Sequence, residues 1–127
     1  MRMPTHSDLA IDGKIYDVIG IDEGQFYPDL VEYVEKWSEE FGIDILVAGL
    51  DGTFERKKFG DMLLLCPLAD EFIKLNAKCH ECLKESGVAT KHLVPAPFSR
   101  RLIASTEEKI IGGADTYHAV CYTHYFA

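Results

Sequence analysis

The sequence predicts an α/β protein in which a parallel-sheet core, residues 14–78, is followed by a small metal-binding domain, residues 79–127. Two short apolar runs with an amphipathic segment between them are typical of a strand–helix–strand unit, and such crossovers connect parallel strands. Two pairs of closely spaced metal-ligand residues, a CxxC and a CxxH, lie in the second half of the chain. Near residue 78 the apolar runs give way to short segments with Pro and Gly pairs, which places the predicted boundary there.

The first strand and the helix of this unit are expected at residues 15–22 and 29–41. Residues 15–22 are apolar and β-branched almost throughout, as in a buried strand. From Leu30 to Phe41 the apolar residues recur at three- and four-residue spacing, which is the pattern of an amphipathic helix. Gly42 follows directly and is a typical helix stop.

The segments that follow complete the expected core. A second buried strand at residues 45–50 leads into a loop with Gly and cationic residues at 51–60. Residues 62–65 are expected to form one or two helical turns, and residues 72–77 a further strand. Cys66 lies in an apolar stretch and is expected in the core.

Composition excludes several classes of protein. Hydrophobic residues make up 47% and charged residues 27% of the 127 residues, as in an ordinary folded domain. No run approaches the roughly 18 apolar residues of a membrane span, and the N-terminus lacks the apolar run of a secretory signal. A cytoplasmic location without a membrane partner is therefore expected. The net charge of −8 argues against nucleic-acid binding, because a phosphate backbone is repelled on average.

Two closely spaced pairs of Cys and His residues predict a zinc site. The four expected ligands are Cys79, Cys82, Cys121 and His124. Three thiolates and an imidazole complete a tetrahedral zinc site, and such a zinc is structural because no position remains for water or substrate. It would tie together the ends of the long loop 83–120. The alternatives are a redox-active CxxC and competition from His80 as a ligand.

Two adjacent carboxylates, Asp22 and Glu23, follow the first expected strand. Ligands of parallel sheets bind beyond the C-terminal ends of the strands, and the second strand ends at Leu50 and Asp51. A strand-terminal Asp is the arrangement that orders Mg²⁺ on nucleotide phosphates, and the adjacent Glu is suited to act as general base on a substrate hydroxyl. The alternative is that both carboxylates only cap the following helix.

A set of aromatic residues lies mostly in loops near the expected strand ends. These residues are Phe26, Phe54, Phe59 and Tyr117. Aromatic faces in a site suit a flat heterocycle such as a nucleobase, and the alternative is that the rings fill the core beneath the loops. The neighbouring Arg56, Lys57 and Lys58 form either a solvated basic turn or a counter-charge for phosphate.

Together, four segments resemble the type II, cytosolic-type thymidine kinases: residues 19–30 (IGIDEGQFYPDL), 50–63 (LDGTFERKKFGDML), 79–82 (CHEC) and 110–124 (IIGGADTYHAVCYTH). The order and spacing of the family hold over residues 15–126. The resemblance implies a P-loop-type, RecA-like core, here truncated, followed by a small zinc ribbon with a lasso loop. It also implies transfer of the γ-phosphate of ATP to the 5′-hydroxyl of thymidine by a cytoplasmic homotetramer, with dTTP as feedback inhibitor.

The resemblance assigns roles at the strand end and around thymidine. Glu23 matches the catalytic base, Asp22 the residue associated with Mg²⁺, and Gly24 and Gln25 the segment that borders the nucleotide. The expected thymidine-binding residues are Phe26, Leu50, Phe54, Phe59, Ser99, Glu108, Lys109, Ile110, Ile111, Gly112 and Tyr117.

Within that set the family gives each part a different task. Phe54 matches an aromatic residue that packs on the base, and Tyr117 a tyrosine that closes over the nucleoside. Residues 108–112 match the lasso, whose main chain hydrogen-bonds the thymine edge. Ser99 takes the place of a hydroxyl near the base if residues 96–101 (APFSRR) fit the family's A-x-[FY]-[ST]-x-R pattern after an insertion, and Thr90 is the rival position.

The family also begins with a strand and a glycine-rich P-loop, and these 127 residues contain no G-x-x-x-x-G-K-[ST] motif. The phosphate site would then need residues from elsewhere, and one side of the sheet is expected to be uncovered. A truncated chain, half of a split enzyme and a degenerate homologue all fit this observation.

Three functions follow from these observations. The first is the catalytic-base and thymidine-binding part of a thymidine kinase, whose activity would require a P-loop. The second is an inactive nucleoside- or dTTP-binding or regulatory subunit, which needs the lasso, Phe54 and Tyr117 but not Glu23. The third is a zinc-ribbon interaction or nucleic-acid module, against which the acidic net charge and the IDEGQF segment argue.

Overall fold

The computed structural model describes residues 16–86, 94–104 and 113–127. The chain divides into two compact units. Unit 1 consists of Met1–Asp51 and Lys58–Phe72, and unit 2 of Gly52–Lys57 and Ile73–Ala127. The short loop Gly52–Lys57 therefore belongs to the same unit as the Cys and His pairs. The sequence-based domain ranges 14–78 and 79–127 stay a prediction about independent folding.

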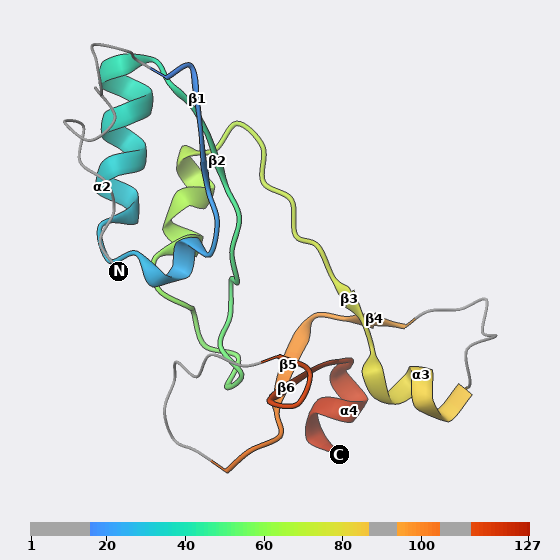
Figure 1. Cartoon of the computed structure of the whole chain (residues 1–127). Helices are drawn as coiled ribbons and strands as arrows, with labels where there is room; N and C mark the ends of the chain where they lie inside the picture. The colour runs from blue at the N-terminus through green and yellow to red at the C-terminus, as the bar shows by residue number, and fades with distance from the viewer. Residues whose placement is uncertain (1–15, 87–93, 105–112) are drawn as a thin grey trace. The chain divides into compact units, whose positions relative to one another are not determined.

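Unit 1 is built on the expected strand–helix–strand pattern. Strand β1 (Val18–Ile21) pairs with β2 (Asp44–Val47) in parallel, with Val18 opposite Asp44 and Ile21 opposite Val47. Figure 1 shows the two strands side by side, with the helix that connects them lying along the pair. The parallel pairing confirms the prediction, because a crossover of this kind brings the chain back in the same direction.

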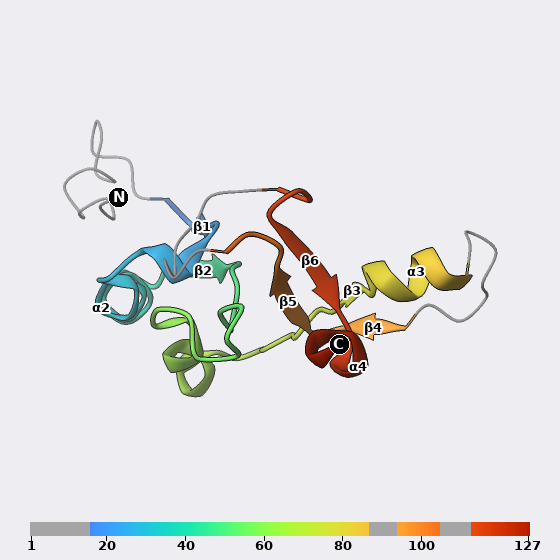
Figure 2. The same cartoon turned by 90° about the horizontal axis from the view of Figure 1, so that it is seen from below.

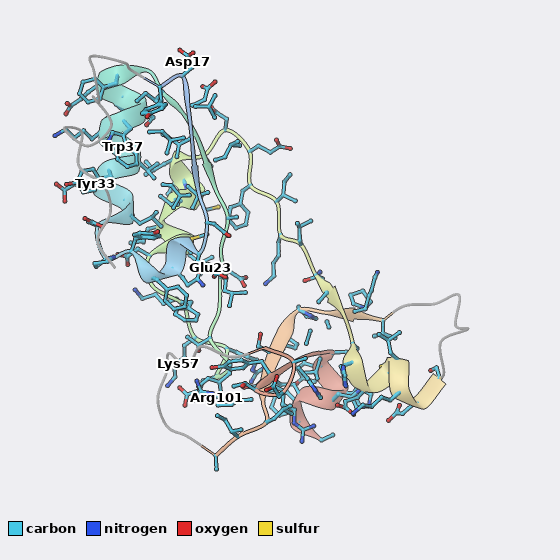
Figure 3. The ribbon with its side chains drawn as sticks, viewed as in Figure 1. Asp17, Glu23, Tyr33, Trp37, Lys57 and Arg101 are labelled. Atoms are coloured by element: carbon cyan, nitrogen blue, oxygen red, sulfur yellow. The ribbon has the colours of Figure 1, made fainter. Side chains whose placement is uncertain are left out.

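The connection between the strands contains three helical pieces. A 3₁₀ turn η2 (Gly24–Phe26) precedes helix α2 (Leu30–Glu35), which continues into a π-helical turn η3 (Lys36–Glu40). Leu30 and Trp37 are fully buried, and with them the core contains Ile21, Ile43 and Leu65. The Tyr33 ring packs on Trp37 at 5.3 Å between centroids, one turn away on the same helix face (Figure 3).

One face of the small sheet is exposed. Val18, the first residue of β1, is 51% exposed, and Leu46 of β2 is 67% exposed. Side chains alternate between the faces of a strand, so these residues lie on the face opposite the buried Ile21. The exposure agrees with the expectation of a sheet that is uncovered on one side.

Two sequence-based expectations for the segment after β2 are wrong. Residues 72–77 were expected to form a strand, but only Ala77 and Lys78 do, as β3, and Leu75 is 87% exposed. An apolar run becomes a strand only when a partner edge is available, and no strand pairs with residues 72–76 in the described part of the chain. Cys66 is exposed rather than in the core.

The exposed position of Cys66 follows from the helix that carries it. The 3₁₀ helix η4 (Met62–Leu68) is longer than the one or two turns expected and runs through Pro67. With three residues per turn, a 3₁₀ helix presents only one narrow row to a core. Here Leu65 is the buried residue of that row, and its neighbours Leu64 and Cys66 are exposed.

The described residues of unit 2 form two short antiparallel pairs and two short helices. Strand β3 (Ala77–Lys78) pairs with β4 (Pro95–Ala96), and β5 (Phe98–Arg101) pairs with β6 (Tyr117–Val120). Helix α3 (His80–Ser86) follows β3, and α4 (Tyr122–Phe126) follows β6 (Figure 2). Its buried hydrophobic cluster is small and consists of Cys79, Ala96, Val120 and Cys121.

Among the described residues, no helix is both long and apolar enough to cross a membrane.

Replacing Leu30 with Ala is expected to destabilise unit 1 by about 2–5 kcal/mol, because the side chain is fully buried and leaves a cavity. The matched control is Leu46→Ala, which removes the same atoms from an exposed position and is expected to change stability by less than about 0.5 kcal/mol. Urea unfolding followed by Trp37 fluorescence measures both. Equal losses in the two variants would show that Leu30 is not the core residue described here.

Candidate functional site

The four predicted metal ligands come together in unit 2. Their ligand atoms lie within 4.8 Å of one another. The Nδ1 atom of His124 is 3.4 Å from the sulfur of each cysteine, and the sulfurs of Cys82 and Cys121 are 3.9 Å apart. Cys79 and Cys121 are buried, and Cys82 and His124 half-buried.

These distances fit a tetrahedral zinc site. With Zn–S near 2.3 Å and Zn–N near 2.0–2.1 Å, tetrahedral angles place two sulfurs about 3.8 Å apart and a sulfur and a nitrogen about 3.6 Å apart. The observed separations of 3.9 Å and 3.4 Å agree with these values. The cluster therefore has the ligand number, ligand type and spacing of a zinc-binding domain.

The backbone around the CxxC pair and the CxxH pair turns so that both ligands of each pair face the same way. Leu83 N donates to Cys79 O at 3.1 Å, and Tyr125 N donates to Cys121 O at 2.9 Å, so each pair is the first turn of a short helix. A cysteine just before a helix and a second ligand three residues on lie on the same side of that turn. The CxxC and CxxH spacings thus lead to the cluster directly.

Three of the four groups have pKa values that their neighbours shift. Burial raises the pKa of the Cys79 thiol, but hydrogen bonds from the backbone of Cys82 and Cys121 outweigh it and lower that pKa to about 6. Burial and the neighbouring thiols raise the pKa of Cys82 to about 12. Hydrogen bonds with Cys79, Cys121 and Glu85 raise the pKa of His124 to about 9. Zinc binds deprotonated ligands, so a bound ion would displace the protons that Cys82 and His124 otherwise keep.

Further side chains around the cluster were not predicted from the sequence. Nε2 of His124 lies 3.1 Å from Glu85 Oε1, which is the carboxylate–histidine arrangement that orients a metal-binding imidazole. His118 Nδ1 lies 3.1 Å from Glu81 Oε1, and this contact lowers the pKa of Glu81. His80 stacks on His118 at 3.6 Å and is not one of the four clustered ligands.

The carboxylates at the end of β1 are exposed and held in a defined conformation. Glu23 has a φ of 52°, in the left-handed region that non-glycine residues rarely adopt. Its backbone N–H donates to Asp22 Oδ1 at 2.9 Å, and its Oε2 accepts a hydrogen bond from Gln25 Nε2 at 2.5 Å. Figure 3 shows Glu23 at the end of the strand, next to η2.

Gln25 links the ends of the two parallel strands. Its side chain is buried, with 2% of the residue exposed, and Oε1 accepts from the backbone N–H of Leu50 at 3.0 Å. A Cβ at Gly49 would collide with that Oε1 atom, and one at Gly60 with the backbone of Gln25. The glycines therefore make room for Gln25, which joins the β2 end to the Glu23 carboxylate through one amide.

The aromatic residues separate into two groups. In unit 1, Phe26 packs edge-on against the buried Phe59 at 5.5 Å. In unit 2, the guanidinium of Arg101 lies 3.7 Å from the ring centroid of Phe54 and donates to Tyr117 Oη at 2.9 Å. Arg101 was not assigned a role from the sequence, although it is the final residue of the A-x-[FY]-[ST]-x-R pattern.

The remaining predicted site residues are Ser99, Leu50 and the lasso residues, and the structure describes only the first two. Ser99 is half-buried in β5, opposite Ala119 of β6, and Leu50 is exposed after β2. The lasso residues Glu108, Lys109, Ile110, Ile111 and Gly112 lie outside the described residues, as does Thr90, the rival of Ser99. The roles of these residues in binding stay predictions.

The small parallel sheet makes the chain a mixed α/β protein, and its C-terminal Cys₃His cluster is consistent with a zinc-binding domain. The family model described as "Thymidine kinase" matches residues 5–125. This chain belongs to the thymidine kinase family.

Relatives of the chain come from animals and viruses. It is 51% identical to "Thymidine kinase, cytosolic" of Gallus gallus over 109 residues, which cover 86% of this chain and 44% of that protein. The identity is 46% to "Thymidine kinase, cytosolic" of Homo sapiens over 119 residues, 94% of this chain and 46% of that protein. The identity is 49% to "Thymidine kinase" of Monkeypox virus (strain Zaire-96-I-16) over 106 residues, which cover 84% of this chain and 54% of that protein. The chain spans about half the length of the curated relatives it matches.

Cys82→Ser is expected to release the metal, because it leaves three ligands and an oxygen in place of a thiolate. The control is Cys66→Ser, since Cys66 is exposed and outside the cluster. Metal content by elemental analysis should fall from one zinc per chain to below about 0.2 in the first variant only. Full retention of zinc in Cys82→Ser would remove Cys82 from the ligand set.

Zinc affinity is expected to rise steeply with pH. Between pH 6.5 and 8.5 the metal-free His124 and Cys82, with pKa values of about 9 and about 12, both carry protons that binding must displace. Each displaced proton makes Kd fall about tenfold per pH unit, so two give about 100-fold. Competition with a chromophoric chelator, corrected for its own protonation, measures the slope. A Kd that falls less than tenfold per pH unit, which corresponds to fewer than one displaced proton, would contradict these protonation states.

Proposed function

We propose that this chain is the catalytic-base and thymidine-binding part of an ATP-dependent thymidine kinase, which transfers the γ-phosphate of ATP to the 5′-hydroxyl of thymidine. The observation that carries the proposal is the family match over residues 5–125. The geometry at the end of β1 supports it, because an exposed carboxylate is held there by a buried amide. Relatives named cytosolic thymidine kinase support a cytosolic location for the protein.

Glu23 would act as the general base in this reaction. The exposed carboxylate accepts the proton of the 5′-hydroxyl as the oxygen attacks the γ-phosphate and ADP leaves. Gln25 holds the carboxylate by its Nε2 while its Oε1 is fixed by Leu50 N, so the base does not need to be ordered when substrate binds. Most of the rate enhancement in phosphoryl transfer comes from such positioning and from charge neutralisation.

Asp22 would contribute to binding Mg²⁺ together with the nucleotide phosphates. An exposed carboxylate at a strand end is a hard oxygen ligand of the kind that Mg²⁺ accepts. When bound, Mg²⁺ neutralises charge on the phosphates. Gly24 and Gln25 would border the nucleotide, and a side chain at Gly24 would collide with Met62 and Val47.

The thymidine side of the proposal follows the family resemblance. Phe54 would pack on the base and Tyr117 close over the nucleoside, and Arg101 contacts both residues in unit 2. The further thymidine-binding residues proposed are Phe26, Leu50, Phe59, Ser99 and the lasso residues 108–112. The zinc would be structural and tie the base of the lasso.

The same resemblance supplies the remaining parts of the proposal. The parallel sheet of unit 1 would belong to a P-loop-type, RecA-like core, and unit 2 would be a zinc ribbon. The whole enzyme would be a homotetramer inhibited by dTTP. Exposed apolar residues on the sheet, such as Leu46, support a surface that further protein covers.

A second candidate is a nucleoside- or dTTP-binding subunit without turnover. It would use the lasso residues 108–112, Phe54 and Tyr117 to bind the nucleoside without phosphoryl transfer. The two candidates differ in what they need: turnover requires Glu23 and a phosphate-binding loop, and binding requires neither.

The deciding measurement is ADP formation with ATP, Mg²⁺ and zinc, with and without thymidine, by the chain alone and then with the P-loop segment of a longer relative supplied in trans. Thymidine binding is measured in parallel by calorimetry. Thymidine-dependent ADP formation in either mixture supports the kinase. Binding without turnover in both supports the subunit, and failure to bind thymidine would contradict both.

Glu23→Gln is expected to lower phosphoryl transfer about 10²- to 10⁴-fold while leaving thymidine affinity within about twofold, because a general base acts in the transition state. Glu39→Gln, an exposed carboxylate on η3, is the matched control and should keep full turnover. Loss of thymidine binding in Glu23→Gln would assign that residue to binding rather than catalysis.

A further inference from the structure

The loop Gly52–Lys57 is held by a cage of aromatic rings in unit 2. The guanidinium carbon of Arg56 lies 4.8 Å from the ring centroid of Tyr125, 4.7 Å from that of Phe126 and 5.7 Å from that of Phe98. A cation within about 6 Å of a ring face is attracted by its quadrupole, and three rings share this one. The cage thus fixes the tip of the loop from outside.

A hydrogen bond joins the same rings to the loop backbone. Tyr125 Oη donates to the carbonyl of Phe54 at 2.7 Å, and the Tyr125 ring packs on Phe98 at 5.6 Å. Phe54 is therefore held through its backbone by a residue of α4, one position after the metal ligand His124. Its ring remains the surface against which Arg101 packs.

The loop is also closed on itself, so that it behaves as one piece. The N–H of the buried Thr53 donates to Lys57 O at 2.8 Å, and Thr53 Oγ1 accepts from Glu55 N and Lys57 N at 3.3 Å each. Arg56 N donates to Thr53 O at 3.0 Å. Anchoring Arg56 and the Phe54 carbonyl therefore anchors the whole turn.

Arg56 adopts a backbone conformation that its side chain disfavours. Its φ of 60° lies in the left-handed region, where a residue with a Cβ is uncommon. Glycine would take this conformation without strain, so a requirement for the guanidinium explains an Arg at this position.

We propose that Arg56 and Tyr125 are positioning residues, which hold the Gly52–Lys57 loop so that Phe54 is presented for a nucleoside base. The part of this inference that concerns the nucleoside rests on the proposed function. Metal binding fixes His124, Tyr125 follows it in the same helical turn, and Tyr125 fixes Phe54. The Cys₃His cluster thereby acts on Phe54 through two consecutive residues of α4.

The first test follows the loop itself. In the zinc-loaded chain, Tyr125→Phe removes one hydroxyl and Tyr122→Phe is the matched control, since Tyr122 is exposed on the same helix. Amide hydrogen exchange of peptides covering residues 50–60 is expected to speed up about fivefold in Tyr125→Phe, as for the loss of one hydrogen bond, and not in the control. Unchanged exchange in Tyr125→Phe at unchanged zinc content would overturn the proposal.

The cation is tested separately at Arg56. Arg56→Gln keeps a polar but shorter side chain and removes the charge, and Arg56→Lys keeps the charge. Exchange is expected to rise about threefold in Arg56→Gln, as for an exposed cation–π contact, and to stay closer to the parent in Arg56→Lys. Equal exchange in Arg56→Gln and the parent would show that the cage does not hold the loop.

Thymidine affinity then tests the link to the nucleoside. Affinity falls with the fraction of chains whose loop is positioned, so Tyr125→Phe and Arg56→Gln are expected to bind thymidine about threefold to tenfold more weakly than Tyr122→Phe. Faster exchange with unchanged affinity would overturn the positioning role. A parent chain that binds no thymidine would overturn the proposed function instead, and the exchange results would still decide whether the two residues hold the loop.

Discussion

The Cys₃His cluster is the interaction on which unit 2 depends. Among its described residues the unit has four buried hydrophobic residues, and two of them, Cys79 and Cys121, are themselves cluster members. Its strands are two to four residues long and its helices five and seven, too short to be stable in isolation. So small a core offsets little of the loss of chain entropy on folding, and a metal ion bound by the cluster would add the stability that it lacks.

Unit 1 depends on a different constraint, the buried amide of Gln25. Parallel strands contribute no turn that fixes one strand end against the other, because their connection runs back along the whole sheet. Gln25 supplies that link, since it bonds Leu50 N after β2 and the Glu23 carboxylate after β1. A buried side-chain amide with both ends bonded costs little in desolvation and specifies one geometry.

The sequence predicted the parts of the fold that depend on local pattern. The parallel β1–β2 pair, the helix with Leu30 and Trp37 buried, and the four-residue metal cluster follow from apolar spacing and from ligand types at fixed separation. The strand expected at residues 72–77 failed because β structure needs a partner edge, which no local pattern reveals.

Contacts between residues distant in sequence escaped prediction for a related reason. Arg56 meets Tyr125, and Glu85 meets His124, only after the chain has folded. The contact of Glu85 could have been predicted from the sequence. Glu85 lies one turn after Cys82 on α3, so its carboxylate is on the same side of the helix as that metal-ligand residue. The contact of Arg56 could not have been predicted in this way, because a charged residue in a Gly-containing loop is usually solvated.

Glu23 and Arg56 are the two non-glycine residues with positive φ in the described part of the chain. One follows β1 at the proposed catalytic position, and the other lies in the loop that carries Phe54. Glycine would relieve the strain at either place, yet a carboxylate and a guanidinium stand there instead. Strain of this kind persists only where surrounding contacts over-determine the conformation, and here those contacts are the Gln25 amide and the aromatic cage. These two residues with positive φ are thus the two whose side chains the proposed chemistry and the proposed loop anchoring require.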